Sequence, residues 1–225
     1  MVVKCPYIVT IARHASASSV LTLCNSKLTA NKMRKIKIIE HISLDGVIQH
    51  EESEDFKYSG WTTPYRTPAG LALLMEEYGS TFDLLLGRRT YDARSGFWSK
   101  AGDSPMANGL NTATKYVATH RPDSLEWGPV RDLGADIIEG IRSVKSTDGP
   151  DLLVCGSTTL TSVLLDQGLV DEIVLIVYPV LLGRGKRIFS DNIDPRELAF
   201  VSTKTTPTGV LLNTFRHVGP LGKTK

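Results

Sequence analysis

The stretch DLLVCGSTTL at residues 151–160 decides the fold prediction, because it changes from an apolar strand to a helix start within ten residues. The continuous apolar run within Asp151–Cys155 is typical of a strand that is buried on both faces. The turn Gly156–Thr158 then breaks the strand, and apolar residues recur at helical spacing as far as Gly168. A strand that leads directly into a helix indicates an α/β protein with a parallel sheet.

The stretch FDLLLGRRTY at residues 82–91 has the same form, since a buried strand ends at Gly87 and a helix follows from Arg88. The same alternation extends along the rest of the chain after Met33. Strands are predicted at residues 36–42, 82–86, 115–119, 151–155 and 171–180, and helices at residues 68–78, 88–95, 137–144 and 158–168. Strands that alternate with helices in this way favour a largely parallel sheet with helices on both faces.

The end of the chain follows a different pattern. Residues 198–205 and 210–218 indicate two strands that are joined as a hairpin across Pro207–Gly209. We therefore predict a three-layer α/β/α fold, in which the C-terminal hairpin adds an antiparallel edge to a mostly parallel central sheet.

Composition excludes several classes of protein. Of the 225 residues, 41% are hydrophobic and 22% are charged, which is typical of a soluble globule and not of a disordered chain, a collagen or a coiled coil. The longest apolar run, residues 173–182, is about half of what a membrane-spanning helix needs, so no membrane contact is expected. Three cysteines without a CxxC pair favour a reducing compartment, the cytoplasm, and the five histidines show no metal-binding spacing.

Residues 1–32 differ from the rest of the chain, because they hold four basic residues and no acidic residue. They are an organelle transit peptide, a translated upstream stretch without function, or an ordered arm. Without them the formal charge changes from +2 to −2, and no basic stripe remains to bind nucleic acid. We expect an N-terminal extension at residues 1–32, one domain at residues 33–219 and a short tail at residues 220–225.

Three turns at predicted strand ends carry the candidate chemistry. The carboxyl ends of parallel strands meet at one edge of a sheet, and a helix N-terminus there offers free N–H groups to phosphate. The turns are Gly87–Thr90, Thr119–Arg121 and Gly156–Thr158, and each alone is commonly just a turn or a helix cap. Together they predict a site for a phosphate-bearing ligand, although the GxGxxG and GxxxxGK[ST] signatures are absent.

Several motifs carry a resemblance to a known family. The sequences SLDG at 43–46, LGRRTY at 86–91, KYVAT at 115–119 and CGS at 155–157 resemble the dihydrofolate-reductase-like superfamily. The sequences GLVDEI at 168–173 and YPVLLGRG at 178–185 are more specific, and they are similar to the C-terminal reductase domain of the riboflavin-biosynthesis deaminase-reductase. The resemblance runs from about residue 36 to about residue 218, without a preceding deaminase-type zinc motif, and so implies a stand-alone reductase domain.

The resemblance implies that NADPH is bound and that a hydride is transferred to a C=N or C=O bond of a small pteridine- or pyrimidine-like substrate. A 5-amino-6-(5-phosphoribosylamino)uracil reductase and a dihydrofolate reductase proper are alternatives within this class. A non-catalytic NADPH-binding module is the alternative from another class. The resemblance also implies a homodimer, for which the long apolar strand and the terminal hairpin are suitable surfaces.

The resemblance also assigns residues to the site. The implied cofactor-binding residues are Ser43, Gly87, Arg88, Arg89, Thr90, Thr119, Arg121, Gly156, Ser157, Thr158 and Leu160. Thr119 and Arg121 would lie near the 2′-phosphate, which favours NADPH over NADH. Asp45 is the candidate proton donor and is alternatively a turn residue before Gly46. Glu76 and Glu77 are more typical of surface charges, and the loop at residues 49–66 is expected to cover the substrate entrance.

One position departs from the family pattern, because Cys155-Gly156 stands where the family has two glycines. In dihydrofolate reductases the corresponding peptide bond is cis, so we predict a cis bond between Cys155 and Gly156. A cis bond outside proline costs about 3–4 kcal/mol and persists only where the surroundings enforce it. Cys155 itself is expected to be a small buried residue and not a nucleophile.

Overall fold

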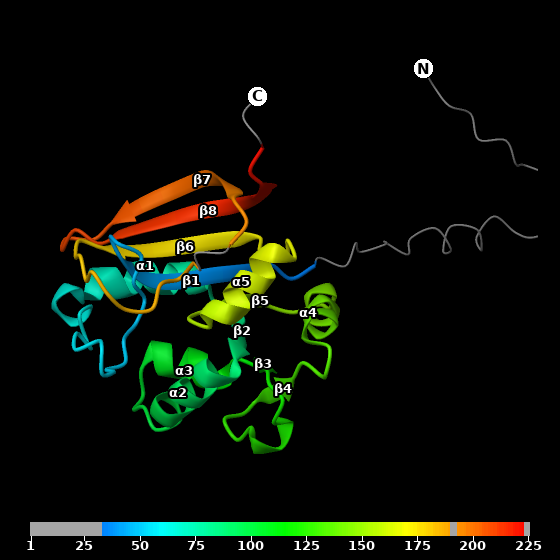
Figure 1. Cartoon of the computed structure of the whole chain (residues 1–225). Coiled ribbons are helices and arrows are strands. Elements are labelled where there is room, and N and C mark those ends of the chain that lie inside the picture. The colour runs from blue at the N-terminus through cyan, green and yellow to red at the C-terminus, as the bar shows by residue number, and fades with distance from the viewer. Residues whose placement is uncertain (1–32, 190–192, 223–225) are drawn as a thin grey trace, which may run out of the picture. The chain divides into compact units, whose positions relative to one another are not determined.

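The computed structural model describes residues 33–189 and 193–222, and the predictions made for residues 1–32 lie outside these ranges. An eight-stranded sheet forms the centre of the domain, in the order β4-β3-β2-β5-β1-β6-β8-β7 (Figure 1). The strands are β1 (Ile36–Ser43), β2 (Phe82–Gly87), β3 (Lys115–Ala118), β4 (Val130–Asp132), β5 (Asp151–Val154), β6 (Glu172–Tyr178), β7 (Arg196–Thr205) and β8 (Leu211–Pro220). The helices are α1 (Pro68–Tyr78), α2 (Arg88–Trp98), α3 (Pro105–Thr112), α4 (Ile137–Ser146) and α5 (Thr158–Asp166), with short 3₁₀ turns η1 (Thr63–Tyr65) and η2 (Pro122–Ser124).

The strand directions confirm the predicted architecture. Strands β1 to β6 pair in parallel, whereas β8 pairs antiparallel with both β6 and β7. The predicted hairpin is present and is longer than the sequence indicated. It closes through a hydrogen bond of 2.9 Å from the Thr206 N–H to the Val210 carbonyl, and Gly209 takes a positive φ of 78°.

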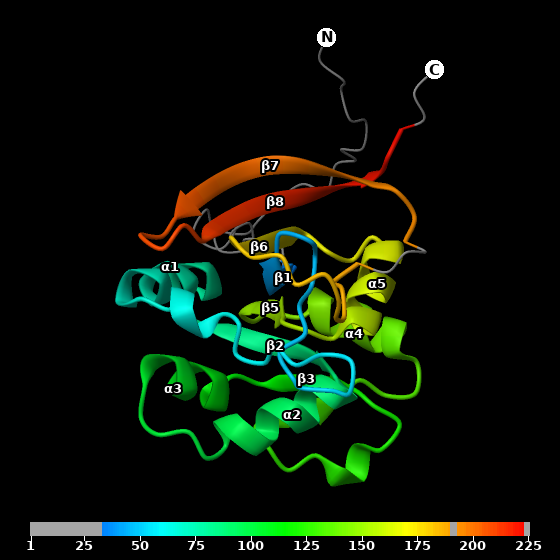
Figure 2. The same ribbon diagram turned by 60° about the vertical axis from the view of Figure 1, so that its left-hand side comes forward.

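The five helices cover the sheet from two sides (Figure 2). One core cluster joins β1, β2 and β5 to α1, α2 and α3 through side chains such as Tyr78, Tyr91 and Leu110. A second cluster joins the opposite face to α4 and α5 through Ile141 and Leu164. The three-layer prediction is therefore confirmed, although α3 and β4 were not predicted.

The helix starts differ in how their free N–H groups are bound. Thr67, Ser104 and Asp136 cap α1, α3 and α4 with side-chain oxygens. In contrast, α2 and α5 start at Gly87 and Ser157 without a side-chain cap. Both uncapped helices follow the carboxyl ends of neighbouring parallel strands, so their first-turn N–H groups are left for other partners at one edge of the sheet.

Within residues 33–189 and 193–222, the structure contains neither a membrane-crossing helix nor a cluster of metal ligands. None of the helices there combines the length and apolar character needed to cross a lipid bilayer. In the same ranges, no three His, Cys, Asp or Glu side chains lie together in a way that could hold a metal ion.

Candidate active site at the carboxyl edge of the sheet

Two of the predicted turns are hydrogen-bonded to each other. The Gly87 N–H donates to the Ser157 hydroxyl at 2.9 Å, and the Ser157 N–H donates to the Thr90 hydroxyl at 3.1 Å. A Cβ atom at Gly87 would lie 3.3 Å from the Ser157 hydroxyl oxygen, so this close approach favours glycine. The starts of α2 and α5 therefore form one continuous polar surface.

The third turn is attached to this surface through Arg88. The Arg88 guanidinium donates to the Arg121 carbonyl at 2.8 Å and to the Asp92 carboxylate at 2.8 Å. The Thr119 hydroxyl accepts a hydrogen bond of 3.0 Å from the Arg121 N–H. The Arg88 side chain is thus already bound within the protein, and its contacts fit the positioning of the turn better than direct binding of phosphate.

Two other arginines supply free positive charge beside the turns. The Arg121 side chain is 70% exposed, and its guanidinium lies 3.9 Å from the Asp92 carboxylate. Arg89 is exposed, and its side chain makes no hydrogen bond or ion pair with the described residues. These two cations are available to a ligand phosphate.

The predicted cis bond between Cys155 and Gly156 is wrong. Within the described ranges the only cis peptide bond is Gly128–Pro129. The chain turns instead through two consecutive residues of positive φ, Gly156 at 75° and Ser157 at 57°. A left-handed serine is uncommon, and its two hydrogen bonds to the α2 turn hold it in this conformation.

A buried carboxyl group, not anticipated from the sequence, lies beneath this turn. Glu40 on β1 is 6% exposed, and its carboxylate accepts a hydrogen bond from the Gly156 N–H. Burial raises the pKa of Glu40 to about 7, although the Gly156 N–H and the positive charge of Arg94 on α2 act in the opposite direction. The sequence did contain a signal, namely an acidic residue in the middle of the isoleucine-rich strand Ile36–Ser43.

Two further buried groups surround Glu40 and Arg94. The Tyr78 hydroxyl lies 3.5 Å from the Cys155 sulfur, and burial raises the pKa of both groups. Both side chains are therefore neutral at physiological pH, which agrees with the expectation that Cys155 is not a nucleophile. Glu40 is consequently the acid that titrates near neutrality next to Arg94.

Aromatic side chains from the loop at residues 49–66 pack over the ends of β1 and β6. His50 and Trp61 are stacked, with ring centroids 5.2 Å apart and planes inclined by 10°. Trp61 also meets Tyr178 edge-on at 5.2 Å, and His41 Nδ1 lies 2.8 Å from the Tyr178 hydroxyl. Burial lowers the pKa of His41 to about 3, so this ring is neutral. The loop thus adds an aromatic wall beside His41 and Tyr178.

Asp45 makes contacts that are typical of a structural carboxylate. It accepts hydrogen bonds from the Ser43 hydroxyl at 2.6 Å, the Leu182 N–H at 3.1 Å and the Gly183 N–H at 2.7 Å. The hydroxyl of Ser43, together with the two N–H groups, lowers the pKa of Asp45 to about 2. These contacts favour a role in holding the loop after β6 and disfavour proton donation, so the catalytic role of Asp45 stays a prediction.

The remaining predicted site residues lie in different surroundings. Thr158 is half-buried at the start of α5, whereas the Leu160 side chain is buried in the second core cluster and faces away from the turn surface. Glu76 and Glu77 both bind Lys204 at 2.9 Å. Glu77 is buried, which differs from the expected surface position, because the C-terminal hairpin covers it through Lys204.

A cavity of about 520 Å³ borders the Arg88 contacts on the outer side of α2. Its lining includes Asp92 and Ser124, both of which bind the Arg88 guanidinium, and also Glu126 and Trp127. Asp92 is paired with Arg88, whereas Glu126 has no ion-pair partner among the described residues, so this cavity carries negative charge and does not suit a phosphate.

Comparison with known proteins identifies the family. The family model of the RibD C-terminal domain matches residues 34–212. The chain belongs to the RibD C-terminal domain family. The predicted resemblance to the C-terminal domain of the riboflavin-biosynthesis deaminase-reductase is thereby confirmed.

Curated relatives of this RibD C-terminal domain protein are uncharacterized. YyaP of Bacillus subtilis is 28% identical over 132 residues, which cover 57% of this chain and 70% of YyaP. YwjB of the same organism is 24% identical over 183 residues, which cover 81% of this chain and 98% of YwjB.

Solved structures support the same fold. A riboflavin biosynthesis protein from Shewanella sp. PV-4, whose assignment is provisional, aligns with a TM-score of 0.61 at 19% identity, over 82% of this chain and 99% of that one. A pyrimidine reductase-like protein from Corynebacterium diphtheriae gives a TM-score of 0.53 at 14% identity, over 82% and 92% of the two chains. A deaminase/5-amino-6-(5-phosphoribosylamino)uracil reductase from Thermotoga maritima gives 0.56 at 18% identity, over 83% of this chain and 57% of that one.

Proposed function

We propose that this protein is an NADPH-dependent reductase that transfers a hydride to a C=N or C=O bond of a small pteridine- or pyrimidine-like substrate. The observation that carries this proposal is the joined pair of uncapped helix starts at Gly87 and Ser157. Membership of the RibD C-terminal domain family supports an oxidoreductase, and its reductase-named structural neighbours support the substrate class.

The residues present fit a dinucleotide. The first-turn N–H groups of α2 and α5, which no side chain caps, suit a pyrophosphate, and Gly87 and Gly156 allow the two turns to pack against each other there. Arg89 and Arg121 are exposed cations that suit the additional 2′-phosphate of NADPH. No residue assigned to this role carries a negative charge.

The bound cofactor would supply the hydride, and the side chains nearby would supply orientation and a proton. Burial raises the pKa of Glu40 to about 7, so this carboxyl group can both hold and release a proton near neutral pH. Arg94 balances its charge when the proton leaves. Trp61 and Tyr178 are buried and pack against each other edge-on, so they would form a rigid wall at the ends of β1 and β6 beside the substrate.

A fluorescence titration with NADPH tests the proposal, followed by a search for NADPH consumption. The substrate panel contains the phosphoribosylamino-pyrimidine, dihydrofolate, and simple carbonyl and imine compounds. We expect micromolar NADPH binding and turnover of one heterocyclic substrate. Binding without consumption of any substrate would support the non-catalytic module, and failure to bind NADPH would remove the proposal.

The assembly and compartment stay predictions. We propose a homodimer, because Phe200 and Val201 on the edge strand β7 are 63% and 56% exposed. Light scattering should give twice the mass of one chain, and a monomeric mass would contradict this proposal.

We propose the cytoplasm as the compartment, which imaging of a tagged full-length chain would test.

A further inference from the structure

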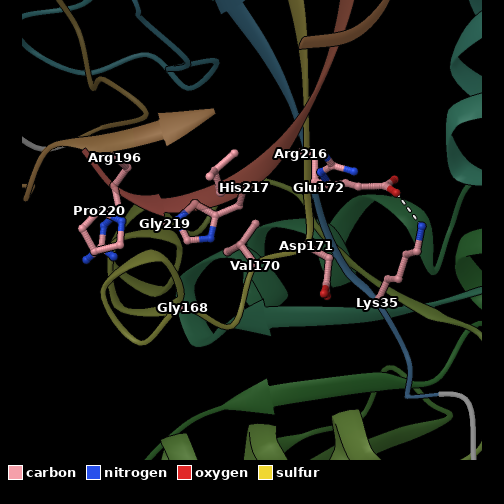
Figure 3. Close-up of a pocket in the computed structure, with 11 residues that line it drawn as sticks. Lys35, Gly168, Val170, Asp171, Glu172, Arg196, Arg216, His217, Gly219 and Pro220 are labelled. Atoms are coloured by element: carbon pink, nitrogen blue, oxygen red, sulfur yellow. Dashed lines mark hydrogen bonds and ion pairs between the residues drawn. The ribbon is translucent and has the colours of Figure 1, made fainter. Parts of the chain in front are cut away.

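A second cavity lies at the opposite edge of the sheet from the candidate active site (Figure 3). Its volume is about 440 Å³, within the range of small-molecule sites. The residues that line it are Lys35, Gly168, Val170, Asp171, Glu172, Arg196, Arg216, His217, Val218, Gly219 and Pro220. Strand β1 runs from this cavity to Ser43, and eight residues of strand separate the two sites by roughly 25 Å.

Two hydrogen-bonding atoms in this cavity have no partner. These atoms are Arg196 Nε and His217 Nε2. Within residues 33–189 and 193–222, they are the two buried side-chain nitrogen or oxygen atoms that make no hydrogen bond. Arg196 binds Asp166 at 3.2 Å through a different nitrogen, so its Nε–H remains free. A buried polar group without a partner costs about 1–3 kcal/mol, so two of them in residues that line one cavity indicate a missing partner.

The acidic residues of the cavity do not serve as this acceptor, because lysines already bind them. Asp171 is paired with Lys145, and Glu172 is paired with Lys35 at 2.6 Å. In contrast, Arg216 makes no ion pair with any described residue. The residues that line the cavity therefore carry a surplus of positive charge, a free Arg196 Nε–H and an unpartnered His217 Nε2.

We propose that this cavity binds a small organic oxyanion, a carboxylate or a phosphate monoester carried on an apolar body. The Nε–H groups of Arg196 and His217 donate to the oxyanion, with the histidine proton on Nε2, and Arg216 supplies unpaired positive charge. Figure 3 shows Arg196 and His217 on the same side of the cavity. Val170 and Pro220 line the same cavity and contact the apolar body. This site goes beyond the proposed reductase function and shares no residue with it.

The test follows the ring signals of the histidines in a ¹³C-labelled sample of the full chain by NMR. The His217 signal is assigned by its absence from the His217→Phe variant. The probes are phenyl phosphate, benzoate and inorganic phosphate, and sodium chloride at matched ionic strength is the control. We expect a saturable shift of the His217 signal with phenyl phosphate and benzoate, a weaker effect of inorganic phosphate, and no saturable shift with chloride.

Two variants locate the binding groups. Arg216→Gln should weaken phenyl phosphate binding about tenfold, because it removes a charge-assisted contact. Arg196→Lys keeps the charge but lacks Nε, and it should weaken binding severalfold. Arg131→Gln, which removes an exposed arginine from β4, is the matched control and should bind as the unaltered chain does.

The proposal is overturned if the His217 signal responds to the probes only as it does to chloride, or if Arg216→Gln and Arg131→Gln bind equally. Circular dichroism of each variant confirms its folding, and the titration of the unaltered chain decides the question without any variant. The readout is independent of NADPH, because His217 on β8 lies beside the start of β6, at the edge of the sheet opposite to the candidate active site. Failure of the reductase proposal would therefore leave this result unchanged, and the reverse also holds.

Discussion

The two edges of the parallel sheet use their polar groups in opposite ways. At the amino edge, charged side chains close the structure, and the buried pair Arg34–Asp83 joins the start of β1 to β2. Arg34 also donates to the Pro150 carbonyl before β5. At the carboxyl edge, backbone N–H groups dominate, because two helices start there without side-chain caps. Glu40 is buried at this edge, and burial raises its pKa to about 7. Along the same strands, the ion pair that closes the start of β1 is thus separate from the turns proposed to bind the nucleotide.

The largest expected effect comes from the amino edge. Arg34 is 2% exposed, and Arg34→Ala leaves the Asp83 carboxylate buried without its partner. We expect the free energy of unfolding in urea to fall by about 3–5 kcal/mol. The NADPH dissociation constant of the folded fraction should stay the same, because the turns are at the other edge.

A matched control lies at the same edge. Lys35 is 46% exposed and binds Glu172, so Lys35→Ala should lower the free energy of unfolding by no more than about 1 kcal/mol. A large change in NADPH affinity in Arg34→Ala would show that the two edges are coupled and would contradict the comparison.

The second effect is a pH dependence that Glu40 creates at the carboxyl edge. The folded chain raises the pKa of Glu40 from 4.5 to about 7, so between these values it binds more protons than the unfolded chain does. The free energy of unfolding should therefore fall by about 3 kcal/mol as the pH rises from about 4.5 to about 7, and level off above that. Glu40→Gln keeps an acceptor for the Gly156 N–H and should remove this slope. A slope that persists in Glu40→Gln would assign it to other groups.

A third, smaller effect should appear when the turn itself is altered. Gly156 has a φ of 75°, and a Cβ atom there would lie 3.3 Å from Thr90 Cγ2. Gly156→Ala should cost about 1–2 kcal/mol of stability and raise the NADPH dissociation constant. Gly96→Ala is the control, because Gly96 lies within α2 with no neighbour within 4 Å, and it should stabilise by about 0.5–1 kcal/mol. Equal effects of the two alanines on NADPH affinity would count against the turn as a binding surface.

The smallest effect separates the two cofactors. Arg121→Gln removes an exposed cation, and it should weaken NADPH binding by about fivefold to tenfold while it leaves NADH nearly unchanged. Arg88→Ala should weaken both cofactors, since Arg88 holds the turn through the Arg121 carbonyl. The measurement is a fluorescence titration of each variant with both nucleotides. Equal losses of NADPH and NADH in Arg121→Gln would contradict the 2′-phosphate assignment.

The sequence predicted the order of the main elements because buried strands and amphipathic helices have different periodicities. It did not predict α3 or β4, since α3 buries only Ala107 and Leu110, and β4 is three residues long. Short elements of this kind depend on neighbours that are distant in the sequence. The strand directions and the hairpin, in contrast, followed from the connections.

The candidate site was predicted less completely. The three turns were found because glycine, serine and threonine after an apolar strand are a local signal. The predicted cis peptide bond after Cys155 was wrong, because the chain turns there through positive φ angles at Gly156 and Ser157. Residue spacing does not distinguish these two ways of making the turn. Glu40 was not predicted as a site residue, because its burial and its hydrogen bond depend on Gly156, which lies 116 positions away in the sequence. The neutral state of His41 depends mainly on burial, which is not local in sequence.

The hydrogen bond between the Gly87 N–H and the Ser157 hydroxyl joins residues that are 70 positions apart. During synthesis, a nascent chain that has not yet extended past Ser157 therefore lacks half of the proposed nucleotide surface. Capture of NADPH on the ribosome would report that β5 has already inserted between β1 and β2, because this long-range pairing must form first. NADPH binding would then occur only after this late step of folding.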